Sequence, residues 1–448
     1  MINKKTNNAI GLRVLFVNRP DMFTIPGGDT THMLRLKAGL EKLGVLVNIS
    51  AELYPDPTDY DLINVFNLLI PQHTLRQVLS LRAQSLVPIV LTPFYWDRSE
   101  SIWGEAAVSK AVEEARNIKE LDDLLAQVAN GKLNVGKYSI SSNNRLYADY
   151  DIEQKTALQF VNHLIPISLK EQELLTKKFD FPESACTTIM TGTDFPKKKA
   201  SPDLFIKKYG VKDFVLITGR VETRKNQLML LNALRDSRLP IVVSGGQPDK
   251  HYLELCKKVA PPNTFFVGRL DDEMLSSARA AARVHALPSW WECAGISHME
   301  ASLDGCNIVV GNKAAEPDYF GEGAYYCDPS NINSIRSAVL SAYQNYEKDT
   351  DRIKSLQNHI YENYGWDSIA QKHLEVYNQV CKEYANLDEY SLDQRKALFQ
   401  IAQTYNYFLK GNLFATVKSL PSLFNSVTHN PLSYYLAGKI SMLANLPE

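Results

Sequence analysis

Short apolar runs rich in β-branched residues alternate with longer helical stretches along most of this 448-residue chain. Strands that are apolar throughout are covered on both faces, and strands separated by helices form parallel sheets with right-handed crossovers. The alternation therefore predicts an α/β fold. The predicted strands are Arg13–Asn18, Val45–Ala51, Asp61–Phe66, Val87–Thr92, His163–Ser168, Thr187–Met190, Phe214–Gly219, Pro240–Ser244, Thr264–Val267, Val284–Leu287, Asn307–Val310 and Ala324–Cys327. The clearest predicted helices are Thr30–Leu43, Asn226–Arg235, Asp271–Ala281 and Asn333–Tyr346.

The length of the chain and one break in the alternation predict two such domains. A chain this long divides into two or three domains. The break is a polar stretch rich in proline and lysine at Pro196–Asp203, and such stretches are typical of linkers. We therefore expect a first Rossmann-like domain at 1–196 and a second at 204–365.

Two segments depart from the strand–helix alternation. Trp103–Asn130 is rich in Glu, Ala and Leu, which predicts a helical insertion in the first domain at about 103–150. Residues 387–448 show no strand pattern and carry many aromatic residues, which predicts a small helical appendix. We favour packing of this appendix on the main body over a role of 390–448 as a helix that binds a partner or lies peripherally on a membrane.

Composition narrows the classes of function and the expected compartment. The net charge of −1 gives no indication of a nucleic-acid partner. The six cysteines form no CxxC pair and the nine histidines form no HxH or HExxH pattern, so we expect free thiols and no metal site. The first nine residues lack the apolar core of a signal peptide, and no apolar run reaches the length of a membrane span, so we expect a cytoplasmic protein.

The most informative motif is Leu287–Ala301, where a strand ends at Pro288-Ser289 and a helix begins near Gly295. Junctions of this kind lie at the carboxyl edge of a parallel sheet, where ligands bind. The free N–H groups at the helix start favour a diphosphate. Glu292 in the loop would reach a sugar hydroxyl, and Glu300 inside the helix a ribose diol. The alternatives are a glutamate that complements the helix dipole and one on a solvated face.

Two further strand ends carry candidate ligand-binding residues. In Ile217–Asn226, Arg220 and Lys225 would bracket a diphosphate and stabilise the charge that builds on a leaving group without a metal ion. Their alternative is a pair of surface charges. After the first predicted strand, Gly27-Gly28 would let the backbone approach a ligand closely, although a plain turn explains the pair equally well. The motif is not GxGxxG, which argues against a nicotinamide enzyme.

Together these motifs resemble those of the retaining glycosyltransferase family 4, whose members adopt the two-domain fold called GT-B. The family pairs two glutamates with seven residues between them, preceded by Pro-Ser and followed by Ala, as in the segment from Pro288 to Ala301 here. Its Gly-Arg-x-x-x-x-Lys element matches Gly219 to Lys225, and its N-terminal Gly-Gly loop matches Gly27-Gly28. Later strand ends match at Gly245-Gly246 and at Gly268-Arg269-Leu270.

The resemblance implies a fold, a reaction and a set of site residues. The fold would be GT-B, with two facing Rossmann-like domains, a crossover helix at 366–386 that returns to the first domain, and the appendix. The reaction would be sugar transfer with retention from a nucleotide diphosphate donor, without cofactor or metal, to a glycan, lipid-linked or protein acceptor. The insertion at 103–150 would then be a lid or an acceptor-side excursion. The catalytic residues would be Arg220, Lys225 and Glu292, and the donor-binding residues Gly27, Gly28, Gly219, Gly268, Arg269, Leu270, Cys293, Ala294, Gly295, Ile296 and Glu300.

The chain departs from the family pattern in its first domain. Many members carry a His-Asp element after a first-domain strand, whereas the corresponding stretch Leu91–Asp97 has no histidine. We therefore assign no catalytic base and place only Asp97 near the site. The departure keeps two alternatives open: a catalytically silent scaffold that binds nucleotide or glycan, and another GT-B enzyme such as a sugar-nucleotide epimerase.

Three further features receive ordinary structural interpretations. Cys293 is expected to be a buried thiol and His298 a packed histidine, since neither has a visible chemical partner in the sequence. The Asp-x-Asp triplets at 59–61, 149–151 and 349–351 follow no apolar strand, so we expect surface turns rather than metal ligands.

Overall fold

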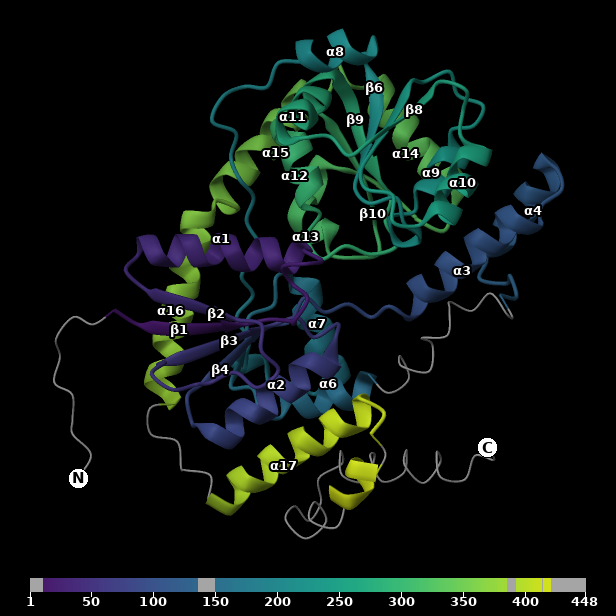
Figure 1. Ribbon diagram of the computed structural model, residues 1–448. Coiled ribbons are helices and arrows are strands. Elements are labelled where there is room, and N and C mark those ends of the chain that lie inside the picture. Colours follow the sequence, from purple (N-terminus) through teal and green to yellow (C-terminus); the bar gives the residue numbers. More distant parts are fainter. Residues whose placement is uncertain (1–10, 136–149, 385–391, 413, 420–448) are drawn as a thin grey trace, which may run out of the picture.

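The computed structural model describes residues 11–135, 150–384, 392–412 and 414–419. These residues form two α/β domains, each built on one parallel sheet, and Figure 1 shows the second domain above the first. The predicted fold class is confirmed. Eleven of the twelve predicted strands are present, with ends that differ by a few residues.

The first domain contains a five-stranded sheet in the order β2-β1-β3-β4-β5, with every pair parallel. The strands β3 and β4 at its centre are buried throughout, as their apolar sequences require. The strands are β1 Arg13–Val17, β2 Leu46–Ser50, β3 Leu62–Phe66, β4 Ile89–Thr92 and β5 His163–Leu164. The main helices are α1 Gly28–Lys42, α2 Pro71–Gln84, α6 Tyr150–Leu158 and α7 Leu169–Phe179.

The prediction of a strand at Thr187–Met190 is wrong. The segment runs beside β5, and its N–H groups at Thr187 and Ile189 donate to the carbonyls of Leu164 and Pro166 at 3.0 and 2.9 Å. The pairing remains a single bridge, between Leu164 and Cys186. Pro166 has no N–H group with which to continue the ladder, so β-branched composition alone does not produce a strand here.

The second domain contains a six-stranded parallel sheet in the order β11-β10-β9-β6-β7-β8. The chain order reverses between β6 and β9, and ligands of open α/β sheets bind at such a reversal. The strands are β6 Phe214–Thr218, β7 Ile241–Ser244, β8 Thr264–Gly268, β9 Ala282–Leu287, β10 Asn307–Gly311 and β11 Tyr325–Cys327. The helices are α8 Asp203–Tyr209, α9 Gln227–Ala233, α10 Lys250–Val259, α11 Asp272–Ala281, α12 Ile296–Leu303, α13 Glu316–Phe320, α14 Ile332–Gln344 and α15 Thr350–Asn363, with short 3-10 turns η3 Thr223–Lys225 and η4 Gly321–Gly323.

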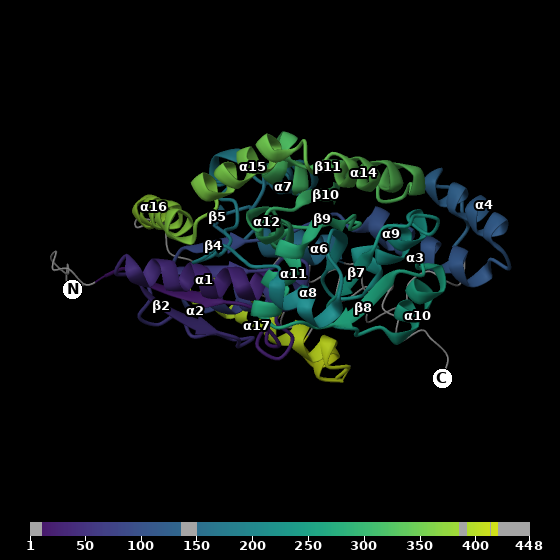
Figure 2. The same cartoon turned by 90° about the horizontal axis from the view of Figure 1, so that it is seen from above.

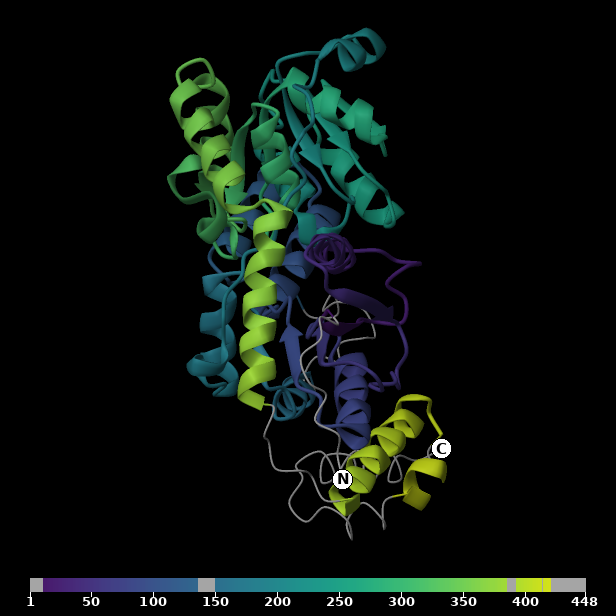
Figure 3. The same cartoon turned by 90° about the vertical axis from the view of Figure 1, so that its left-hand side faces the viewer.

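The chain crosses between the domains twice, and the two crossings meet. Thr193 forms a parallel bridge with Gly365, and its N–H donates to the carbonyl of Tyr364 at 2.9 Å. The second crossing leads into α16 Trp366–Tyr384, which runs down the first domain against α1 (Figure 3). Residues 385–386 of the expected crossover helix lie outside the described residues.

The insertion consists of two helices, α3 Ser99–Glu114 and α4 Ile118–Ala129. They lie beside α9 and α10 of the second domain, as Figures 1 and 2 show from two directions. The contacts include Arg235 to Asp122 at 2.6 Å and Lys258 Nζ to the carbonyl of Val112 at 2.9 Å. The insertion is therefore packed on the second domain. Residues 136–149 of the expected insertion lie outside the described part.

The described part of the appendix packs on the first domain. Helix α17 Leu392–Leu409 lies against α2, with Ile401, Ala402 and Tyr405 buried and Asn406 accepting from Arg76 at 2.7 Å. This arrangement agrees with packing on the main body for α17, whereas 420–448 fall outside the described residues. Among the helices described, none is long and apolar enough to span a lipid bilayer.

Candidate active site

The site predicted from the sequence lies where the second sheet reverses its strand order. The loop after β6 carries Gly219 to Lys225, and the loop after β9 carries Pro288 to Gly295. The turns that leave β6 and β7 touch: a Cβ atom on Gly245 would lie 1.8 Å from the carbonyl oxygen of Gly219. Both glycines have positive φ, +136° at Gly219 and +153° at Gly245, so only glycine fits there.

A buried cluster of charges joins these two loops. Lys225 Nζ pairs with Glu292 Oε1, and Arg224 Nη1 lies 3.3 Å from the same oxygen. Ser289 Oγ also donates to Glu292 at 2.9 Å. The side chains of Lys225 and Glu292 are only 13% and 11% exposed. We call Arg224, Lys225 and Glu292 the charge cluster.

The electrostatics of the charge cluster keep Glu292 ionised. Burial alone would raise the pKa of Glu292, but the positive charges of Lys225 and Arg224 outweigh burial and lower this pKa to about 2. Burial, followed by the charge of Arg224, lowers the pKa of Lys225 from its usual value. The charge cluster therefore holds one carboxylate, that of Glu292, beside two cations at the strand-order reversal. An anionic ligand could take the place of this carboxylate next to the cations.

The structure brings Lys225 and Glu292 together, as the motifs predict. The arginine beside them is Arg224, whereas the sequence predicted Arg220. Arg220 is 52% exposed and pairs with Glu222 at 3.3 Å. Arg224, which the sequence did not single out, stacks on the Trp291 ring at 4.8 Å and donates to the Trp291 carbonyl at 3.2 Å. The only available signal was the adjacency of Arg224 to Lys225 in a charged run.

The loop after β9, residues 288–295, leads into α12, and we call it the donor loop after the role predicted for it. Gly295 has a φ of +67° and precedes the helix, as the motif predicts, with Cys293 and Ala294 before it and Ile296 as the first helical residue. Glu300 lies in α12 and pairs with Arg279 at 3.1 Å. Burial raises the pKa of Glu300. The side chain of Glu300 is thus ion-paired and 35% exposed.

The remaining residues predicted to bind the donor lie at the carboxyl end of β8 and at the start of α1. Gly268 has a φ of +69°, and its carbonyl accepts from the Gly245 N–H at 2.9 Å, so it continues the row of strand ends. Arg269 is exposed and Leu270 half-buried. Gly27 precedes the first turn of α1, and Gly28 is the first residue of that helix.

The histidine and the cysteine within the motif are packed, as expected. His298 Nδ1 lies 2.9 Å from His285 Nδ1, and His285 Nε2 lies 2.6 Å from the Thr218 hydroxyl. Burial lowers the pKa of His298 to about 3, so the ring is neutral. Burial raises the pKa of Cys293 well above its usual value, so this thiol is a poor nucleophile.

The first domain meets the donor loop at the end of β4. Cys293 Sγ lies 3.8 Å from the carbonyl oxygen of Phe94, a residue with a φ of +48°. The buried carboxylate of Glu171 accepts from the N–H groups of Tyr95 and Ile167 and so fixes this loop. Asp97 pairs with Lys178 at 3.5 Å and is not part of the charge cluster.

The sequence also missed a buried ion pair at the strand-order reversal of the first sheet, between β1 and β3. Arg19 Nε donates to Asp29 at 2.9 Å, and Asn67 donates to the same carboxylate at 3.2 Å. The first turn of α1, which contains Gly28, is anchored by this pair.

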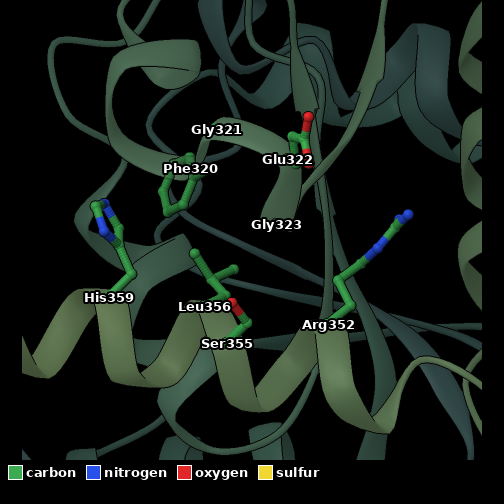
Figure 4. Close-up of a pocket in the computed structure, with 8 residues that line it drawn as sticks. All are labelled: Phe320, Gly321, Glu322, Gly323, Arg352, Ser355, Leu356 and His359. Carbon is green, nitrogen blue, oxygen red and sulfur yellow. The ribbon is translucent and has the colours of Figure 1, made fainter.

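Two cavities lie away from the charge cluster. One of about 400 Å³ opens between η4 and α15 (Figure 4), lined by Phe320, Gly321, Glu322, Gly323, Arg352, Ser355, Leu356 and His359. Another of about 310 Å³ separates the insertion from α9 and α10. Neither is lined by a residue that the sequence assigned to the site. Within the described ranges, no three His, Cys, Asp or Glu side chains converge to hold a metal ion.

Comparison with known proteins agrees with this geometry. Residues 204–359 match a family model described as "Glycosyl transferases group 1". The second domain matches the group 1 glycosyltransferases.

The chain is similar to the O-antigen chain mannosyltransferase B of Escherichia coli, with 25% identity over 195 residues, 40% of this chain and 51% of that protein. A glycosyltransferase of Methanocaldococcus jannaschii is 24% identical over 253 residues, 52% of this chain and 65% of that protein. The matches thus span about half to two thirds of these relatives.

Solved structures extend the likeness to both domains. Sucrose-phosphate synthase from Thermosynechococcus elongatus superposes with a TM-score of 0.63 at 15% identity, covering 83% of this chain and 100% of that one. Anabaena HepE in complex with UDP and glucose gives a TM-score of 0.56 at 15% identity, covering 82% and 100%. WaaG, a glycosyltransferase of lipopolysaccharide biosynthesis, gives 0.55 at 15% identity, covering 81% and 99%. The two-domain GT-B fold implied by the resemblance is confirmed.

Proposed function

We propose that this protein is a retaining glycosyltransferase that moves a sugar from a nucleoside diphosphate to an acceptor hydroxyl in glycan biosynthesis. The observation that carries the proposal is the buried charge cluster at the strand-order reversal of a group 1 glycosyltransferase domain. Buried cations are unfavourable unless an anion accompanies them, and Glu292 supplies that anion here. A bound diphosphate would offer the same cations a second anionic partner, and the transfer assay below separates an enzyme from a scaffold that only binds nucleotide. The names of two relatives, one acting on the O-antigen chain and one in lipopolysaccharide biosynthesis, support a glycan or lipid-linked acceptor.

The geometry supports a specific sequence of contacts. Lys225 is paired with Glu292. When the donor binds, its diphosphate would take over Lys225, with the exposed Arg220 closing on the other side, and Glu292 would turn to the sugar hydroxyls. Glu300 would bind the ribose, and the N–H groups at the start of α12 would bind the diphosphate.

The same contacts would assist the chemical step. The bond between the anomeric carbon and the phosphate oxygen breaks, and the acceptor oxygen bonds to that carbon on the same face. The acceptor proton passes to the leaving phosphate oxygen, so no protein base is required. Lys225 and Arg220 would stabilise the charge gained by the diphosphate, which makes a metal ion unnecessary. The six cysteines are unpaired, which supports a reducing compartment such as the cytoplasm.

Thermal unfolding with UDP, GDP, ADP and TDP in the absence of metal tests the proposal. A ligand at 100 times its Kd adds about 2.7 kcal/mol to the free energy of unfolding, so the matching diphosphate should raise the Tm. Arg220→Ala should weaken this binding roughly 10- to 100-fold because it removes charge-assisted hydrogen bonds. Arg238→Ala, an exposed arginine outside the site, is the matched control.

The outcomes separate the candidate functions. Stabilisation by one diphosphate, together with transfer from the corresponding labelled sugar nucleotide, supports the transferase. Diphosphate binding without transfer to any glycan acceptor, and without hydrolysis, would favour the catalytically silent scaffold. If no diphosphate shifts the Tm of the wild-type protein, the donor site proposed here is wrong.

A further inference from the structure

Glu316 is a buried acidic residue whose carboxyl group has no hydrogen-bond partner beyond its own backbone N–H. It is the first residue of α13 and is 0% exposed. Both carboxyl oxygens are shielded from solvent, and neither forms a hydrogen bond with another side chain or with the backbone of another described residue. Buried polar groups in folded proteins are nearly always hydrogen-bonded, so a carboxyl group left this way requires a physical explanation.

The position of Glu316 connects it to the candidate active site. The N–H of Ala315, the preceding residue, lies 3.4 Å from the carbonyl of Glu292 and donates to it. The charge of Glu292 raises the pKa of Glu316 in addition to the larger effect of burial, while Lys225 and Arg224 act in the opposite direction. Glu316 therefore lies within electrostatic range of all three members of the charge cluster.

Helix α13 also lies at the boundary between the domains, on the side of the second domain that faces the first in Figure 1. Asp318 accepts from the N–H of Lys170 at 2.8 Å, and the Tyr319 hydroxyl accepts from the N–H of Thr191 at 3.0 Å. Helix α13, which begins with Glu316, thus contacts both the loop that carries Glu292 and the first domain. In the proposed transferase, the donor sugar occupies this region.

Three polar residues that lie close to Glu316 in the chain or interact with its charge are bonded to other groups. Lys313, three residues earlier, pairs with Glu100 and with Asp328, the latter at 3.2 Å. The Tyr326 hydroxyl donates to the carbonyl of Gly321 at 2.6 Å, and the Tyr319 hydroxyl donates to that of Ile167. A structural role as an ion-pair or hydrogen-bond partner within the fold therefore does not account for this residue.

We propose that Glu316 is a specificity-determining residue that hydrogen-bonds a hydroxyl group of the donor sugar. The inference rests on the proposed transferase function and adds to it a residue that selects the sugar. A neutral carboxyl group both donates and accepts, which matches a sugar hydroxyl that does the same. A site that leaves a buried polar group unpaired when the hydroxyl is missing discriminates strongly against such an analogue.

The first experiment compares a free diphosphate with its sugar-loaded form. The probes are UDP with UDP-glucose, GDP with GDP-mannose and ADP with ADP-glucose, and the pair is chosen by the thermal screen. Glu316→Leu should bind the free diphosphate within about twofold of wild type but bind the sugar nucleotide roughly 10- to 100-fold more weakly, since one hydrogen bond is lost. Glu316→Gln, which keeps a donor and an acceptor, should lose less. Glu322→Gln, an exposed glutamate nearby, is the control.

The variants should fold, because Glu316→Leu replaces an unpaired buried carboxyl with an apolar group of similar size and should not lower the Tm. A deoxy-sugar donor identifies the hydroxyl. Wild type should discriminate against the correct deoxy donor by tenfold or more, and Glu316→Leu should not.

The outcomes keep the two proposals apart. If the diphosphate binds to wild type and Glu316→Leu binds the sugar nucleotide equally well, the transferase stands and the role of Glu316 is wrong. The same conclusion follows if Glu316→Leu weakens both ligands in proportion. If wild type binds no diphosphate at all, the donor site itself is wrong, and the inference about Glu316 is overturned with it.

Discussion

Each sheet reverses its strand order once, and each reversal holds a buried ion pair, but the two pairs differ in span. In the first domain, Arg19 reaches Asp29 only ten residues away and also donates to the carbonyl of Ile25, so the pair braces its own loop. In the second domain, Lys225 and Glu292 are 67 residues apart and join two separate loops. An ion pair within one loop stabilises the conformation of that loop. An ion pair between two loops makes the positions of both loops depend on its charges. We therefore assign the chemistry to the second pair and a supporting role to the first.

The largest effect is expected when the cation of each ion pair is removed in a separate variant. Lys225→Met leaves Glu292 buried with fewer cations, which should lower the free energy of unfolding by about 3 kcal/mol, and it should lower kcat roughly 100- to 1,000-fold because the leaving group loses a fixed charge. Arg19→Met should lower stability comparably but change kcat far less. Urea unfolding and transfer assays measure both quantities.

A double variant sharpens this first prediction. Lys225→Met with Glu292→Gln removes both charges, so it should recover part of the lost stability but no activity. If Arg19→Met reduces kcat as much as Lys225→Met does, the distinction between the supporting pair and the catalytic pair is wrong.

A smaller effect is expected at the contact of the insertion with the donor loop. A Cβ atom on Gly104 of α3 would lie 2.3 Å from the ring of Trp290, which follows Ser289 directly. Gly104→Ala should therefore lower the free energy of unfolding by about 1–3 kcal/mol through overpacking, and it should raise the KM for the donor more than that for the acceptor. The control is Ser109→Ala on the same helix. An unchanged Tm and donor KM would show that α3 does not support the donor loop.

The smallest effect is expected where the two domains are alike, because each contains a pair of buried neutral histidines. These are His285 and His298 in the second domain, and His32 of α1 with His373 of α16 in the first. Burial lowers the pKa of His298 to about 3 and that of His373 to about 4, against an ordinary value of 6.5. The folded state therefore resists protonation: the stability associated with each histidine is fully present above about pH 6.5 and is lost as the pH falls toward the folded pKa.

This dependence is measurable from urea unfolding at pH 7, 6 and 5. Below pH 6.5 each such histidine contributes a slope of about 1.4 kcal/mol per pH unit, so His298→Gln should reduce the slope by about that amount. His251→Gln, at an exposed histidine, is the control. An unchanged slope in His298→Gln would mean that His298 is protonated in the folded protein.

The sequence predicted those parts of the site in which strand, loop and helix are contiguous. Apolar runs that end at Gly219 and Pro288 marked two strand ends, and parallel strands bring such ends to one edge, so Lys225 and Glu292 were correctly placed together. The sequence could not rank Arg220 against Arg224, because burial of Arg224 depends on Trp291 and Glu292, which are distant in the chain.

Other features depend on contacts with no local signal. Gly104 packs on Trp290 although 186 positions separate them, so the placement of the insertion on the second domain was not predictable from helix propensity. The lack of a partner for the carboxyl oxygens of Glu316 is likewise a property of the folded chain that no local sequence pattern indicates. The strand prediction at Thr187–Met190 failed for a related reason, because a strand needs a partner ladder as well as β-branched residues.

The bridge between Thr193 and Gly365 places both chain crossings at a single point, near the start of α16. Figures 1 and 2 show α16 and the insertion helices α3 and α4 at opposite ends of the molecule. If the domains swing about the bridge, displacement grows with distance from this pivot and is largest at the insertion. The hydrogen bonds of Asp122 and Val112 to the second domain therefore act on the longest lever arm. A few weak contacts placed there oppose opening with more torque than the same contacts beside the pivot.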